Sequence, residues 1–161
     1  MHGFRVFLTA GAVSAMTLLL WHSRAAAEPL EHYQPPLLAK AERALERGQP
    51  RRSLALLQGR VLELRPGAQR AAAHDLVCRA YFAQGDWQRA EPACDAAVEE
   101  GGGSAAWSFR NNRGVMRLLQ GRTDAAIADF RAAARLQPRS RPVAKNLALA
   151  ERTAAAQFSL R

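Results

Sequence analysis

The stretch NNRGVMRLLQGRTDAAIADFRAAARLQP, residues 111–138, predicts two helices joined by a short turn. Residues 111–120 form the first expected helix and residues 123–136 the second, with Gly121-Arg122 as the break and Pro138 as the stop. Small residues and one aromatic residue occur where the helices would cross: Gly114, Ala126, Ala133 and Phe130. Helices approach closely only at small residues, and one hairpin cannot bury its apolar face alone. The stretch therefore predicts copies of itself on either side.

Earlier parts of the chain repeat this pattern. Glycines occupy the expected turns at residues 48, 85 and 121, in steps of 37 and 36 residues. We expect hairpins at about residues 37–64, 71–100 and 105–137, the first two made of helices over 37–47, 51–64, 71–84 and 88–100. A single amphipathic helix is expected over residues 142–158. The Gly-rich run at 101–104 predicts a looser joint than the one at Pro138.

The chain resembles the tetratricopeptide repeat family in four features: small residues at the helix crossing, a glycine at the turn, an aromatic residue on the second helix and a closing proline. The resemblance covers residues 37–158 and is weakest in the first hairpin, where Ser53 and Arg60 replace the usual alanines. It implies an all-α fold: a right-handed α-solenoid of about three hairpins with a C-terminal capping helix. The composition agrees, because aromatic residues are only 7% and no stretch alternates like a strand.

The first residues follow a different pattern. Residues 6–21 are uncharged and lie between Arg5 and Arg24, and an Ala-rich site ends at Ala27. This arrangement predicts a secretory signal peptide over residues 1–27, followed by a Pro-rich linker over 28–36. The alternative is a retained membrane anchor. Export predicts a periplasmic protein, and retention predicts one that is anchored in the inner membrane and faces the periplasm.

The basic charge gives a weaker indication of the partner. The formal net charge is +9, and loss of residues 1–27 removes two arginines and lowers it to +7. In the cytoplasm such a charge would favour nucleic acid. For an exported chain we expect no nucleic acid, and a membrane contact only through an uncleaved N-terminal segment. Acidic proteins or anionic surfaces are the natural partners, and the alternative is a charge that serves solubility alone.

The two cysteines, Cys78 and Cys94, are equidistant from the turn at residue 86. In an antiparallel hairpin, residues equidistant from the turn lie opposite each other. Both cysteines also occupy inward positions of the repeat pattern. Because an exported chain meets an oxidising compartment, we predict a Cys78–Cys94 disulfide. The alternative is two reduced, buried cysteines. There is no CxxC motif, and only His32 and His74 remain in the mature chain, so no redox or metal site is expected.

The resemblance also assigns an inner, concave face to the first helix of each hairpin. The residues expected there are Asp75, Arg79, Phe82, Ser108, Asn111, Asn112, Val115, Leu119, Lys145, Asn146, Leu149 and Arg152. Asn112 and Asn146 stand 34 residues apart, at a place where family members hold the backbone of an extended peptide. The alternative is that these amides face solvent or cap a neighbouring group. Asp75 and Arg79 replace the Lys and Asn of the family's carboxylate clamp, so chaperone-tail binding is not expected.

Three arginines form a stripe on the first helix of the third hairpin, at Arg110, Arg113 and Arg117. One interpretation is an anion-binding seam. The other is structural, with the arginines paired to Glu99, Asp124 or Asp129.

No catalytic set and no cofactor motif appears in the sequence. The chain is therefore expected to be a non-catalytic interaction scaffold of the bacterial periplasm or cell envelope, which holds a partner protein or peptide segment in its concave face. The alternatives are a structural or assembly subunit docked by its outer face, or a membrane-anchored adaptor.

Overall fold

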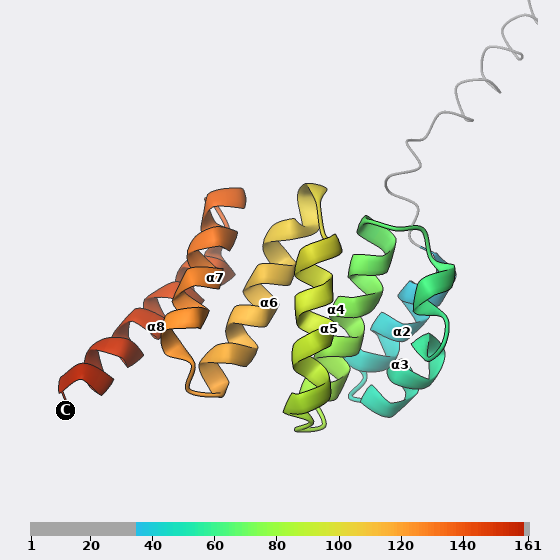
Figure 1. The fold of residues 1–161 in the computed structure, drawn as a ribbon, viewed down its shortest axis with the longest axis horizontal. Coiled ribbons are helices and arrows are strands. Elements are labelled where there is room, and N and C mark those ends of the chain that lie inside the picture. The colour runs from blue at the N-terminus through green and yellow to red at the C-terminus, as the bar shows by residue number, and fades with distance from the viewer. Residues whose placement is uncertain (1–34, 160–161) are drawn as a thin grey trace, which may run out of the picture. The chain divides into compact units, whose positions relative to one another are not determined.

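The computed structural model describes residues 35–159, which form seven α-helices stacked in chain order (Figure 1). The helices are α2 (Pro36–Glu46), α3 (Pro50–Leu57), α4 (Ala68–Phe82), α5 (Trp87–Glu100), α6 (Ala106–Leu119), α7 (Thr123–Leu136) and α8 (Arg141–Ser159). Short 3-10 turns lie at Val61–Glu63 and Gly103–Ala105. This part of the chain is an all-α solenoid, as the repeat pattern predicts.

The helices pair into three hairpins, α2/α3, α4/α5 and α6/α7, with α8 packed on α7. The helix α7 has the predicted bounds, and α8 extends the expected 142–158 by one residue at each end. The turn glycines Gly48, Gly85 and Gly121 have φ of +68°, +73° and +77°. Because only glycine adopts such angles freely, these residues fix the three turns.

The predicted helix over residues 51–64 is wrong in its second half. The helix α3 ends at Leu57, because Gly59 has φ of +73° and turns the chain out of the helix. Val61 and Leu64 still pack on the buried cluster around Leu38 and Leu57, but they reach it from the 3-10 turn. The apolar spacing predicted burial correctly and the backbone conformation incorrectly.

The crossing of α6 and α7 is built as the small-residue pattern predicts. Phe130 is fully buried, and so are Ala126 and Ala133. A Cβ atom added at Gly114 would lie 2.7 Å from Cε1 of Phe130, so the ring occupies the space that any larger residue needs. Ala150 of α8 joins the same cluster, which attaches the capping helix to the third hairpin.

The Gly-rich joint is packed closely at its first residue, contrary to the looser joint that its sequence suggests. A Cβ at Gly101 would lie 2.4 Å from both the Ala97 carbonyl oxygen and the Phe109 ring. Phe109 is buried against Ala71 and Ala97. Glycine at residue 101 therefore allows α6 to approach the end of α5.

Ser53 introduces a polar group into the otherwise apolar contact of the first hairpin. Its side chain is fully buried, and its hydroxyl has no hydrogen-bond partner among the described residues. A buried, unpaired hydroxyl costs about 1–3 kcal/mol. We predict that Ser53→Ala raises the free energy of unfolding by about 1 kcal/mol in urea titrations. Ser108→Ala is the control, because the Ser108 hydroxyl donates to the Ala105 carbonyl and its loss should not stabilise the chain.

The predictions for the N-terminus fall outside the described residues. These are the signal peptide or anchor over residues 1–27 and the first seven residues, 28–34, of the linker predicted over 28–36. Pro36, assigned to the linker, is the first residue of α2, a position that tolerates the missing N–H of proline. In residues 35–159 no helix is both long and apolar enough to cross a membrane.

Candidate protein-binding face

The first helices of the hairpins line one side of the solenoid. Contacts run in succession from α2 to α4, from α4 to α6 and from α6 to α8, whereas the second helices α3, α5 and α7 make at most marginal contacts with one another. The first helices are therefore more closely spaced, and the stack curves towards them. This side is called the inner face below.

A pocket of about 310 Å³ opens on the inner face between three successive first helices. It is lined by Leu45 of α2, by Cys78, Arg79, Phe82 and Ala83 of α4, and by Asn112, Val115 and Met116 of α6. Four of these residues were predicted for the concave face: Arg79, Phe82, Asn112 and Val115. The lining is mainly apolar, with one cation and one amide, a composition typical of small binding sites.

The asparagines of the inner face form a ladder between neighbouring first helices. The side-chain amide of Asn112 donates to Asp75 Oδ1 at 2.8 Å, and that of Asn146 donates to Asn111 Oδ1 at 2.9 Å. Each bond joins a first helix to the preceding one at the same place in the repeat. The amide oxygens of Asn112 and Asn146 accept no hydrogen bond within residues 35–159. Each amide is thus held in place and keeps polar atoms for a ligand.

The other predicted inner-face residues lie outside the pocket. Lys145 and Arg152 are exposed on α8, and neither has an ion-pair partner among the described residues. Leu149 and Leu119 are 47% and 63% exposed. The Ser108 hydroxyl bonds to the Ala105 carbonyl at the start of α6. Of the lining residues absent from the prediction, Leu45 could have been found, because it precedes Phe82 by the 37-residue step between the first two hairpins.

Asp75 is a buried carboxyl that contacts two residues of the pocket lining, Asn112 and Arg79. Burial raises the pKa of this carboxyl above its ordinary value of 3.8, and nearby Glu42 adds to the rise. The hydrogen bond from Asn112 and the charge of Arg79, 3.5 Å away, act in the opposite direction. The folded chain therefore holds a proton on Asp75 more tightly than the unfolded chain does.

This raised pKa predicts a pH dependence of stability. As the pH falls through the raised pKa, the wild type gains stability relative to Asp75→Asn, and the gain is complete below the ordinary value of 3.8. The asparagine still offers an oxygen to Asn112 but does not titrate. Urea titrations of both proteins from neutral to acidic pH measure the difference. A difference that stays constant with pH contradicts the prediction.

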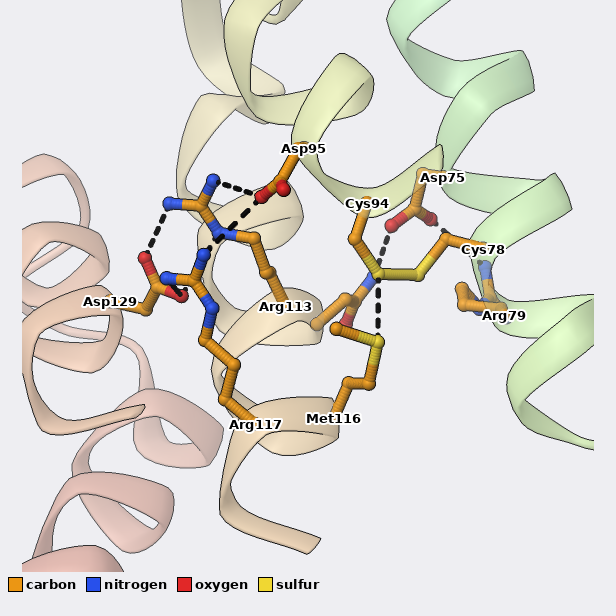
Figure 2. Close-up of a disulfide and its surroundings, with 10 residues drawn as sticks. Asp75, Cys78, Arg79, Cys94, Asp95, Arg113, Met116, Arg117 and Asp129 are labelled. Atoms are coloured by element: carbon orange, nitrogen blue, oxygen red, sulfur yellow. Dashed lines mark hydrogen bonds and ion pairs between the residues drawn. A yellow bond between two sulfur atoms is a disulfide. The ribbon is translucent and has the colours of Figure 1, made fainter. Parts of the chain in front are cut away.

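The arginine stripe is engaged in an ion cluster that joins three helices, and Figure 2 shows its four members. Arg113 contacts Asp129 at 2.6 Å and Asp95 at 2.8 Å, and Arg117 contacts the same two carboxylates at 2.8 and 3.3 Å. Burial alone would lower the pKa of Arg113. The hydrogen bonds and charges of Asp129 and Asp95 together outweigh burial, so the pKa of Arg113 is raised above its ordinary value. The cluster is defined as Asp95, Arg113, Arg117 and Asp129.

This arrangement favours the structural interpretation of the stripe. The two arginines already have carboxylate partners, and the third, Arg110, donates to the Ala106 carbonyl within α6. Of the predicted partners only Asp129 takes part. Glu99 and Asp124 form no ion pair with described residues, and Asp95, which was not predicted, takes their place.

A disulfide joins Cys78 of α4 to Cys94 of α5, as predicted, with the Cα atoms 5.0 Å apart (Figure 2). Met116 of α6 lies against it, with its Sδ 3.6 Å from Cys94 Sγ. Cys78 and Met116 both line the inner-face pocket. The cross-link therefore supports the apolar wall of the pocket.

Removal of this disulfide should destabilise the chain. The bond closes a loop with a sequence separation of 16 residues, and loops of this length stabilise by about 3 kcal/mol. We expect Cys78→Ala/Cys94→Ala to lose about this much in urea titrations. Reductant should lower the stability of the wild type by a similar amount and leave the double variant unchanged. Equal stability of the wild type with and without reductant contradicts the prediction.

Helical hairpins that stack so that their first helices form one continuous face define an α-helical repeat protein. Residues 79–141 match the tetratricopeptide repeat family model. Among the described residues no group of His, Cys, Asp or Glu side chains is arranged to hold a metal ion.

Two solved structures have the same fold. The first tetratricopeptide repeat domain of human RPAP3 is 16% identical, with a TM-score of 0.67, and the match covers 76% of this chain and 93% of that domain. The second RPAP3 domain, solved in complex with the HSP70 peptide SGPTIEEVD, is 17% identical, with a TM-score of 0.60 and coverage of 70% and 90%. A comparison with curated protein sequences gives no significant match.

Proposed function

We propose that this chain is a non-catalytic scaffold that holds an extended segment of a partner protein along its inner face. The observation that carries the proposal is the inner-face pocket flanked by the asparagine ladder. Tetratricopeptide repeats present extended concave surfaces of this kind to their partners.

The inner-face pocket and the asparagine ladder bind different parts of the partner segment. Leu45, Phe82 and Val115 offer an apolar site for one side chain of the partner. The amide oxygens of Asn112 and Asn146 accept from backbone N–H groups, and their remaining N–H groups donate to carbonyls. Because Asp75 and Asn111 already orient these amides, binding costs little further ordering.

The second RPAP3 domain and its bound peptide support a peptide as the class of ligand. The present chain differs from the family's carboxylate clamp, because the acidic Asp75 stands where the clamp has Lys and Arg79 stands where it has Asn. A C-terminal carboxylate at that point would meet Asp75. The proposed ligand is therefore an internal extended segment rather than a chaperone tail.

The proposed setting is the bacterial periplasm or cell envelope. The signal-like pattern of residues 1–27 supports export, and a disulfide between two repeat helices suits an oxidising compartment. The intact mass of protein recovered from an exporting host tests this. A mass that begins at Glu28, with no thiol that can be labelled before reduction, is expected. A mass that includes Met1, with two free thiols, contradicts it.

Selection from a displayed library of random peptides tests the scaffold function. The immobilised protein is the exported product, and the matched variant is Val115→Arg, which places a charged side chain in the inner-face pocket. Peptides enriched on the wild type should be lost on the variant and kept on Glu99→Ala, a change at an exposed residue of the outer helix α5. Peptides retained by all three proteins contradict the inner face as the binding site.

A further inference from the structure

A second concave site, separate from the inner-face pocket, lies on the first hairpin. It has a volume of about 350 Å³ and is lined by Lys40, Arg43, Ala44 and Arg47 of α2, by Gln49, and by Arg52 and Leu56 of α3. A neighbouring hollow shares Gln49 and Arg52 and adds Arg51. These two hollows are called the first-hairpin pocket.

The cations of this pocket lack acidic partners within residues 35–159. Lys40, Arg43, Arg47 and Arg51 form no ion pair with any described carboxylate, and Arg52 has only a 3.4 Å hydrogen bond to Gln49. The middle of the solenoid differs, because Arg113, Arg117 and Arg122 there pair with carboxylates. Five cationic side chains therefore line the first-hairpin pocket without a carboxylate partner among residues 35–159.

One of the two acidic residues of α2, Glu42, faces a different direction. Lys40, Arg43, Ala44 and Arg47 recur every three or four residues and form one stripe along the helix. Glu42 lies on the opposite side, near enough to Asp75 of α4 to help raise the pKa of that carboxyl. Glu42 thus lies towards the inner face and the cations towards the pocket, while Glu46, near Arg43 at the end of α2, forms no ion pair with a described residue.

The pocket combines cations at its rim with Leu56 and Ala44 as an apolar lining. Arginine forks bind carboxylates in a two-point geometry, and they bind more strongly where an apolar surface excludes water. We propose that the first-hairpin pocket binds an acidic segment of a partner protein in which Asp or Glu residues flank an apolar side chain.

A second copy of this chain does not fit the pocket. Among described residues the carboxylates without a basic partner are Glu42, Glu46, Glu99 and Asp124, and of these only Glu42 and Glu46, one turn apart on α2, lie together, which is too few for five cations. A protein segment fits better than a membrane, because side chains can enter a hollow between two helices and a flat lipid surface cannot.

Fluorescence anisotropy with a labelled peptide of Glu–Glu–Leu repeats tests the proposal on the exported protein. The peptide should bind the wild type, and Arg43→Gln/Arg47→Gln should weaken binding by about ten-fold or more. The matched control is Arg139→Gln/Arg141→Gln, which removes the same charge at the other end of the solenoid and should change binding by less than about two-fold. Val115→Arg should leave this binding intact, which separates the result from that of the inner face.

Several outcomes overturn the proposal. Equal weakening by both double variants means general charge attraction, and equal binding of a Gln–Gln–Leu peptide means that carboxylates are not recognised. Binding to phosphatidylglycerol vesicles that depends on Arg43 and Arg47, without peptide binding, means that the site serves a membrane.

Discussion

Phe130→Ala is expected to lower the free energy of unfolding by about 3–5 kcal/mol. The ring, which α7 carries, is fully buried against α6 and α8. It lies next to Gly114 of α6 and packs with Ala126 of α7 and Ala150 of α8. Truncation removes the apolar contacts of the ring and leaves a cavity that these small neighbours cannot fill. Urea titrations of the wild type and the variant measure the loss.

Three further variants test whether the loss comes from the buried contact between Phe130 and Gly114. Phe158 of α8 is 83% exposed, so Phe158→Ala should change the stability by less than about 0.5 kcal/mol. Gly114→Ala alone should destabilise by about 1–3 kcal/mol, because its Cβ would lie 2.7 Å from the ring. In the Phe130→Ala background the added methyl enters the cavity and should cost less. Additive losses contradict the contact between these residues.

Asp129→Ala is expected to destabilise the chain by about 3–5 kcal/mol. The Asp129 side chain is only 6% exposed and contacts both Arg113 and Arg117, themselves 16% and 15% exposed. Its removal leaves two mostly buried guanidinium groups that share Asp95, whose side chain is 37% exposed. A buried charge without its partner costs far more than the pair contributes. Thermal and urea unfolding should both show the loss.

Replacement of the buried members by apolar residues should have a much smaller effect. Buried ion pairs exchanged for well-packed hydrophobic residues often leave stability nearly unchanged. We therefore expect Arg113→Leu/Arg117→Leu/Asp129→Leu to stay within about 2 kcal/mol of the wild type. If Asp129→Ala alone stays within about 1 kcal/mol, the cluster is solvated and the account of it is wrong.

The fold could be predicted because its determinants are local in the sequence. Gly121, Phe130 and Pro138 fix one hairpin by turn conformation, ring volume and helix termination. The same spacing placed the Cys78–Cys94 pair across a turn. The end of α3 was missed because a single glycine, Gly59, interrupts a run whose apolar spacing continues to Leu64.

The partners across helices could not be predicted, because they depend on how far one helix slides along the next. Asp95 and Glu99 are four residues apart on the same face of α5, so either could meet Arg113. The close approach at Gly101 sets the offset between α5 and α6 and is compatible with Asp95 as the partner. The bonds of Asn112 to Asp75 and of Asn146 to Asn111 depend likewise on the offset between hairpins.

The dissociation constant of one library-selected peptide tests the central claim most directly, measured by calorimetry for the wild type and three variants. Asn112→Ala and Asn146→Ala should each weaken binding by about ten-fold, the effect of losing one to two hydrogen bonds. Glu99→Ala on the outer helix should leave it unchanged. Weakening by Glu99→Ala, with no effect of either asparagine variant, would contradict an inner-face binding site and place the partner on the outer helices.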